Sequence, residues 1–334
     1  MALSHAMGHL CFVQADPIRA PAAAQDLILR HRVSSYTNGD LVRDYPSLDL
    51  EEDVFYAYGF MPRETWQLIR PLADTELSDL EQLVLTSVCE SGPTHPRDLI
   101  EVFGRKRVRN DWGGYSLATK RTLEILHRRG LLRVARRENG VRLYEAAMPP
   151  ARKRCPQERF LELIMVLAKI FAPVRRKSLQ ARIAPLRRRV LGQSKSRGEI
   201  DELLRAGRLE SQVVDETTYL WPESRHPLDE VQPTVRFLAP FDPVVWDRER
   251  FKHLWGWTYR FEAYKPKSER IRGYYAMPML FNDDIIGWAE VKSNDSGMDV
   301  KLGFIRKRPK SRSFKSALDA ELARMESFLQ IKAA

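Results

Sequence analysis

Between residues 75 and 147, three amphipathic segments are followed by a hairpin signal, and this order constrains the fold more than any other stretch of the chain. The third segment ends at Gly130, a residue typical of helix C-termini, and Asn139–Gly140 favours a tight turn between two strands. The predicted elements are helices over 77–88, 96–103 and 117–129 and strands over 131–135 and 141–144. Three helices followed by a two-stranded hairpin predict a winged helix.

The same pattern returns in a degenerate form after a linker of two prolines and three basic residues, 149–154. An apolar helix is predicted over 160–171 and a short helix near Leu179. A third helix over 197–206 and a hairpin over 208–220 complete the pattern. We therefore expect a second winged helix.

The last third of the chain changes to aromatic-rich segments with the alternation of β-strands, followed by one amphipathic helix. The strands are predicted over 259–264, 273–280 and 285–292, and the helix over 313–331. The fold class is accordingly α+β, with tandem winged helices, an antiparallel β module and a C-terminal helix. The predicted units are 1–74, an N-terminal motif segment interpreted as an incomplete first winged helix, 75–148 and 149–225, the two winged helices, and 226–334, the β module and closing helix.

Charge is concentrated in the middle of the chain. The formal net charge is +11, yet residues 1–75 carry 6 Lys and Arg against 10 Asp and Glu. Residues 97–142 carry 13 basic residues against 5 acidic ones, and residues 152–208 carry 16 against 5. Such an excess in two consecutive blocks favours a polyanionic partner, and double-stranded DNA is the leading candidate. Solvated helix faces and a protein-binding scaffold remain the alternatives.

Seven basic side chains are the candidate DNA contacts. They are Lys120, Arg121, Arg128 and Arg129 on the third helix, Arg137 and Arg142 beside the hairpin turn, and Arg197 in the second unit. Long cations without an accompanying set of base-reading amides suit phosphates better than base edges. We therefore expect binding that depends little on DNA sequence.

Other classes are disfavoured by composition. The longest apolar run, near residues 161–174, is interrupted by charges and is too short to span a bilayer, so no membrane partner is expected. The N-terminus lacks a secretory pattern, and three scattered cysteines suggest a reducing cytoplasm. No spacing typical of metal ligands stands out, so neither a metal nor another cofactor is predicted.

The candidate catalytic residues are Gln14 and Asp16, which precede Pro17. In an extended segment, residues two apart point to the same face, which would place a carboxylate beside an amide. A carboxylate can deprotonate water and stabilise a nearby cation, while an amide can orient that water. An ordinary strand end, or a helix N-cap at Asp16, is the alternative for such a common pattern.

The chain resembles the bacterial winged-helix DNA glycosylases over nearly its whole length. The motifs that carry the resemblance are Gln14-Ala15-Asp16, Phe60-Met61-Pro62-Arg63, Lys120-Arg121-x-Leu123-Glu124, Pro240 to Arg248, and Tyr259-Arg260-Phe261-Glu262 with Gly273-Tyr274. The Gln-x-Asp form is similar to that of the crosslink-unhooking branch, whereas the self-resistance branch carries Gln-x-Gln.

This resemblance implies an N-glycosylase that acts on duplex DNA with alkylated bases, including N7-alkylguanine and interstrand crosslinks. We also expect the enzyme to be monofunctional and monomeric. Asp16 would stabilise the sugar cation and activate a water held by Gln14. Four residues of the C-terminal motifs, Asp242, Trp246, Arg248 and Arg260, would support the site near the DNA channel, with plain core packing as the alternative. A non-catalytic winged-helix regulator is the competing class, and a nuclease is the weakest, because no acidic metal cluster is evident.

Overall fold

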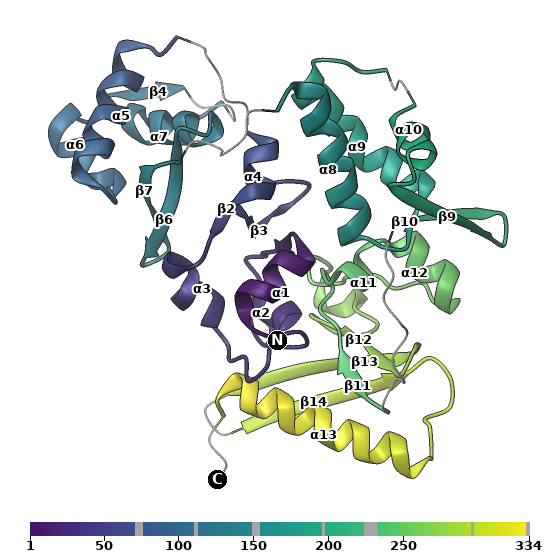
Figure 1. Cartoon of the computed structure of the whole chain (residues 1–334). Coiled ribbons are helices and arrows are strands. Elements are labelled where there is room, and N and C mark those ends of the chain that lie inside the picture. The colour runs from purple at the N-terminus through teal and green to yellow at the C-terminus, as the bar shows by residue number, and fades with distance from the viewer. Residues whose placement is uncertain are drawn as a thin grey trace.

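The protein has a mixed α and β fold, as predicted (Figure 1). The computed structural model describes residues 1–70, 76–109, 113–148, 154–195, 198–223, 233–294 and 297–331. The N-terminal segment consists of α1 (Leu3–Leu10), β1 (Val13–Gln14), α2 (Ala24–Leu29), α3 (Asp40–Asp44), the 3-10 turn η1 (Tyr45–Ser47), β2 (Leu50–Val54), β3 (Tyr58–Pro62) and α4 (Arg63–Ile69). Its strands form an antiparallel sheet in the order β1-β3-β2. In Figure 1, α1 and α2 lie between the C-terminal sheet and the two basic units.

The first basic unit contains the three predicted helices and the predicted hairpin. Its elements are α5 (Asp79–Ser91), α6 (Pro96–Phe103), β4 (Arg107–Arg109), β5 (Tyr115–Leu117), α7 (Ala118–Arg128), β6 (Leu132–Glu138) and β7 (Val141–Ala146). Asn139 and Gly140 both adopt left-handed backbone angles, with φ of 49° and 81°, as a tight hairpin turn requires. The short β4–β5 pair was not predicted, because three-residue strands carry too little alternation to be recognised.

The second basic unit differs from the prediction in one helix. Its elements are α8 (Pro156–Ile170), β8 (Val174–Arg175), α9 (Arg176–Leu191), α10 (Glu199–Arg205), β9 (Leu209–Val214) and β10 (Thr217–Pro222), with strand order β8-β10-β9. The short helix expected near Leu179 is wrong, because α9 has 16 residues and includes Pro185. Only Leu179, Ile183, Leu186 and Arg187 of α9 are buried, so its apolar stripe is sparse in an otherwise basic sequence.

The C-terminal part is a four-stranded antiparallel sheet with a long helix. Its elements are β11 (Val235–Phe237), α11 (Pro243–Trp246), α12 (Arg248–Trp255), the 3-10 turn η2 (Lys267–Glu269), β12 (Met277–Phe281), β13 (Asp284–Asn294), β14 (Gly297–Phe304) and α13 (Arg312–Leu329), with strand order β11-β12-β13-β14. The strand predicted over 259–264 is wrong, because this segment is a loop. Its aromatic alternation reflects packing instead, since the buried Tyr259 donates to the carbonyl oxygen of Ala276 at 2.6 Å.

Two hydrophobic cores meet at the first strand of the chain. Val13 belongs to a core that joins the N-terminal helices to the C-terminal sheet and α13. Its neighbour Phe12 belongs to a different core, which it shares with α4 and the helices of the second basic unit. Successive side chains of a strand point to opposite faces, so both cores fix the strand that leads into Gln14 and Asp16.

Candidate active site

Gln14 is positioned by a short strand that lies unusually close to β3. Val13 pairs with Phe60 and Gln14 with Gly59. A Cβ atom on Gly59 would lie 2.2 Å from the carbonyl oxygen of Val13, so only glycine allows this approach. The predicted extended conformation at Gln14 is therefore present, and it depends on a glycine in the opposing strand.

Asp16 follows the strand in a tight local turn. Its Oδ1 accepts a hydrogen bond from the backbone N–H of Ile18 at 2.9 Å. The backbone N–H of the preceding Ala15 donates to the backbone carbonyl oxygen of Tyr58. The carboxylate is half-buried and lines a cavity of about 650 Å³. The remaining lining residues are Ala15, Pro17, Arg19, Ala23, Gln25, Val42, Glu52, Tyr58, Phe60, Arg137, Asn139 and Gly140. The hairpin turn of the first basic unit thus borders the same cavity as Asp16.

Glu52 holds that hairpin in place. It is 2% exposed on β2, and it accepts hydrogen bonds from Nε of Arg137 and Nε of Arg142, each at 2.9 Å. Arg137 also donates to the hydroxyl of Tyr58 at 2.8 Å, and the guanidinium of Arg142 lies 5.0 Å from the centroid of the same ring. Both arginines were predicted to contact DNA, and the structure places both in ion pairs with Glu52, while Arg137 also lines the cavity.

The acidic run Glu51-Glu52-Asp53 is buried throughout, a feature that sequence reasoning missed. Glu51 accepts from Nε of Arg63 at 2.9 Å and from Nε of Arg133 at 2.8 Å. Asp53 pairs with Arg70 and accepts from the indole N–H of Trp66. Three consecutive acidic residues would ordinarily predict an exposed segment. Here arginines from later segments form ion pairs with these carboxylates, which allows them to be buried.

Tyr275 is a second residue that the sequence did not identify. It is 1% exposed, and its hydroxyl has no hydrogen-bond partner among the described residues. Burial raises the pKa of this hydroxyl well above its usual value, and the charges of Tyr259 and Asp16 act in the same direction. The hydroxyl therefore stays protonated, and Asp16 is one of the charges that raise its pKa.

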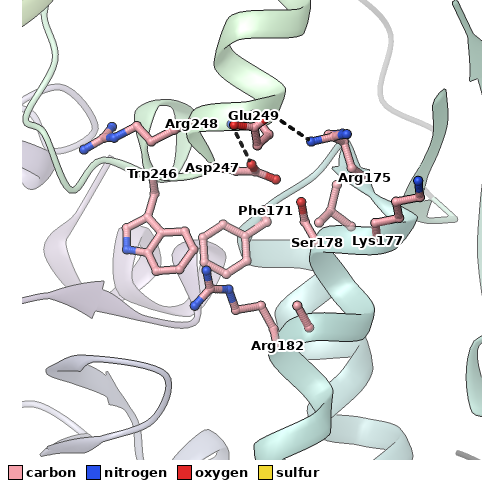
Figure 2. Close-up of a pocket in the computed structure, with 11 residues that line it drawn as sticks. Phe171, Arg175, Lys177, Ser178, Arg182, Trp246, Asp247, Arg248 and Glu249 are labelled. Atoms are coloured by element: carbon pink, nitrogen blue, oxygen red, sulfur yellow. Dashed lines mark hydrogen bonds and ion pairs between the residues drawn. The ribbon is translucent and has the colours of Figure 1, made fainter. Parts of the chain in front are cut away.

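Gln14 is connected to the C-terminal part of the chain by a hydrogen bond. The indole Nε1 of Trp246 donates to Gln14 Oε1 at 2.8 Å, across 232 residues of sequence. Trp246 also borders a separate cavity of about 490 Å³ between α9 and the start of α12, with Phe171, Arg175, Lys177, Ser178, Arg182 and Asp247 among its lining (Figure 2). Asp247 Oδ2 is buried there without a described hydrogen-bond partner.

The other three supporting candidates lie in different environments. Asp242 is fully buried, accepts from the backbone N–H of Val244, and forms a two-pronged ion pair with Arg32 at 2.8 and 3.0 Å. Arg248 donates to the carbonyl oxygens of Val245 and Pro240, and its guanidinium lies 4.5 Å from the Tyr259 ring centroid. Burial lowers the pKa of Arg248. Arg260 is exposed on the loop that follows. Of the four, Trp246 alone contacts Gln14 or Asp16 through a hydrogen bond recorded among the described residues.

The basic candidates on α7 are not equivalent. Lys120 and Arg128 are exposed, whereas Arg121 is half-buried and donates to the carbonyl oxygen of Arg109 at 3.0 Å. Arg129 pairs with Glu81 at 3.3 Å. Arg197 lies outside the described residues. Lys120 and Arg128 are therefore the most accessible members of the predicted set on this helix.

The described residues contain no cluster of three or more His, Cys, Asp or Glu side chains that could hold a metal ion. Within the same ranges, none of the helices is both long and apolar enough to cross a membrane.

Residues 7–328 match the family described as DNA glycosylase AlkZ-like. Because the match covers nearly the whole chain, the protein belongs to this family of DNA glycosylases. It is therefore a hydrolase that acts on DNA and a DNA repair enzyme.

Proposed function

We propose that this protein hydrolyses the N-glycosidic bond of N7-alkylated guanine in duplex DNA, with interstrand crosslinks among its substrates. The observation that carries the proposal is the half-buried carboxylate of Asp16, which lines a cavity of about 650 Å³ next to the strand that bears Gln14. Cavities of roughly 300 to 1,000 Å³ are typical for small ligands, so a single base with its sugar can be accommodated. Many glycosylases reach the bond of a single damaged base by extruding its nucleotide from the duplex.

The enzyme has to assist the reaction mainly at the sugar, because the base is already a good leaving group. An N7-alkylguanine carries a positive charge, and when the bond between sugar C1′ and base N9 breaks, its electron pair neutralises the departing base. The sugar is left as an oxocarbenium-like cation, which the Asp16 carboxylate stabilises. Water then forms the new bond to C1′, and its proton passes to Asp16. The products are the free neutral base and an abasic site.

We further propose that the enzyme is monofunctional, which means that it releases the base and does not cleave the DNA strand. A lyase that cleaves the DNA strand through a Schiff base needs an amine nucleophile, usually a lysine. The described lining of the Asp16 cavity contains Arg19 and Arg137 as its cations and no lysine. We therefore expect the abasic strand to stay intact until alkali or heat cleaves it.

We infer that the two basic units are winged helices that position the duplex through its phosphates. Exposed Lys120 and Arg128 on α7 support this role, because long cations on one helix suit the backbone rather than base edges. The hairpin turn at Asn139–Gly140 lies at the cavity of Asp16, so DNA held by this unit would lie next to the proposed catalytic residue. We also propose that the enzyme is a monomer and works in the cytoplasm. Its three cysteines form no disulfide, which is compatible with a reducing compartment.

The test is incubation of the protein with a duplex that contains a single N7-methylguanine, with the released base measured directly. Release of free base, with an intact abasic strand, supports the proposal. Tight binding without release from N7-methylguanine or from a crosslinked duplex would instead favour the non-catalytic regulator. An unmodified duplex of the same sequence is the control.

A further inference from the structure

The side-chain amide of Gln14 has an orientation that the structure settles. A glutamine amide carries one acceptor oxygen and one NH₂ group with two donors, which look alike in shape. An indole N–H can only donate. Because Trp246 Nε1 lies 2.8 Å from the amide, the oxygen of Gln14 must face the indole, and the NH₂ group must face elsewhere.

Packing from several parts of the chain fixes the indole itself. The guanidinium of Arg182 on α9 lies 3.9 Å from the centroid of the Trp246 ring, over its face. The rings of Phe171 and Tyr56 approach to 4.9 and 5.2 Å between centroids. Figure 2 shows Phe171 and Arg182 beside the indole of Trp246. A ring that is held on its face and edges leaves its N–H little freedom to turn away from Gln14.

The free half of the amide is its NH₂ group. No described residue accepts a hydrogen bond from Gln14 Nε2. With Oε1 turned to the indole, the NH₂ group is the part of the amide that faces away from Trp246, and it donates its hydrogen bonds to whatever binds beside it. A water held by this NH₂ group must therefore turn its own protons toward another acceptor, and Asp16 lies two residues away.

We infer that Trp246 is the positioning residue of Gln14: it holds the amide oxygen toward the indole, so that the NH₂ group holds the attacking water and this water gives its proton to Asp16. This inference rests on the proposed hydrolytic function. Trp246 does not touch the reacting atoms in this account. It acts through Gln14, and its loss is expected to reproduce the loss of Gln14.

The decisive variant is Trp246→Phe, which removes the N–H but keeps an aromatic ring against Phe171, Tyr56 and Arg182. Single-turnover base release at saturating enzyme should slow by about 5- to 100-fold, the scale of one positioned hydrogen bond. Gln14→Ala should slow release by a similar factor. The double variant should be no slower than the slower single variant, because both changes remove the same orientation. DNA affinity and melting temperature should change little.

Trp255→Phe is a matched control. Its indole N–H also donates one hydrogen bond at 2.8 Å, to the carbonyl oxygen of Asp283, away from the site. This variant should release base at the wild-type rate. A general effect of losing an indole N–H would slow both tryptophan variants alike, and that result would overturn the inference.

Other outcomes are equally decisive. A folded Trp246→Phe protein with the wild-type rate, or a double variant whose losses multiply, would overturn the role of Trp246. The same holds if Gln14→Ala is fully active, since Trp246 would then have nothing to position. Failure of the proposed function looks different, because the wild-type protein and Trp255→Phe would then release no N7-methylguanine either.

Discussion

Arg137 on the hairpin of the first basic unit donates to the buried Glu52 on β2 at 2.9 Å, and this ion pair holds the hairpin turn at the cavity that contains Asp16. Arg142 shares the same carboxylate. Two cations of the predicted DNA-binding set are thus neutralised by the enzyme itself in the absence of DNA. A phosphate that contacts either arginine must compete with Glu52.

Glu52→Gln should therefore raise DNA affinity while lowering stability. The neutral amide leaves Arg137 and Arg142 without a charged partner, so both become available to phosphates. The free energy of unfolding should fall by about 1 to 3 kcal/mol, less than for a fully buried pair, because both arginines are about 30% exposed. Fluorescence anisotropy over a salt series and urea unfolding measure the two effects.

Glu138→Gln is the control for this prediction. Glu138 lies on the same hairpin and pairs with Arg136, but both side chains are more than 40% exposed. It should change stability by only a few tenths of a kcal/mol. Weaker or unchanged DNA binding by Glu52→Gln would show that Arg137 and Arg142 act as structural ion pairs only.

Removal of Lys120 and Arg121 together should weaken binding to all duplexes alike. The slope of log affinity against log salt should decrease by about 0.9 for each phosphate contact that is lost. Because Arg121 also donates to Arg109, the single variants will separate its local contact from its effect on DNA. A strong preference among unmodified sequences, in the wild-type protein, would contradict phosphate-directed binding.

Stability should decline as the pH falls below about 6.5, because His31 and His127 are buried. Burial, together with neighbouring arginines, lowers the pKa of both imidazoles well below the usual 6.5. The unfolded chain then binds protons that the folded chain excludes, so stability is lost progressively from pH 6.5 downward, by up to about 1.4 kcal/mol per pH unit for each histidine. Urea unfolding between pH 5.5 and 7.5 measures this slope.

His127→Phe should reduce that acid sensitivity, since the ring lies between Trp66 and Tyr144 and a phenyl group can replace it. An unchanged slope in this variant would mean that His127 titrates normally.

Base release should be unaffected by EDTA. The leaving base is already cationic and needs no Lewis acid, and the described residues offer no group of metal ligands. Release that is lost in EDTA and restored by added metal would contradict the proposed mechanism.

Much of the fold could be predicted because its signals are local. The Asn139–Gly140 turn, the helix over Pro96–Phe103 and the C-terminal helix each follow from turn chemistry or apolar spacing. The wrong strand over 259–264 shows the limit of such reasoning. Aromatic alternation records which side chains are buried, and here Tyr259 packs beneath the sheet without joining it.

Only those residues of the site that are close together in the sequence could be predicted to act together. Gln14 and Asp16 share one short segment, so a sequence pattern could connect them. Two other features depend on tertiary packing: the hydrogen bond from Trp246 to Gln14, and the ion pair by which Glu52 holds the hairpin. The same is true of the burial of Tyr275. No spacing along the chain signals a partner 232 residues away.

Single-turnover release of N7-methylguanine by Asp16→Asn tests the central claim most directly. The asparagine Oδ1 can still accept from the N–H of Ile18, so the local turn and the melting temperature should be preserved. With the charge removed, release should slow by about 100-fold or more, while DNA affinity stays the same or increases slightly. A folded Asp16→Asn protein that releases the base at the wild-type rate would contradict the catalytic assignment of Asp16.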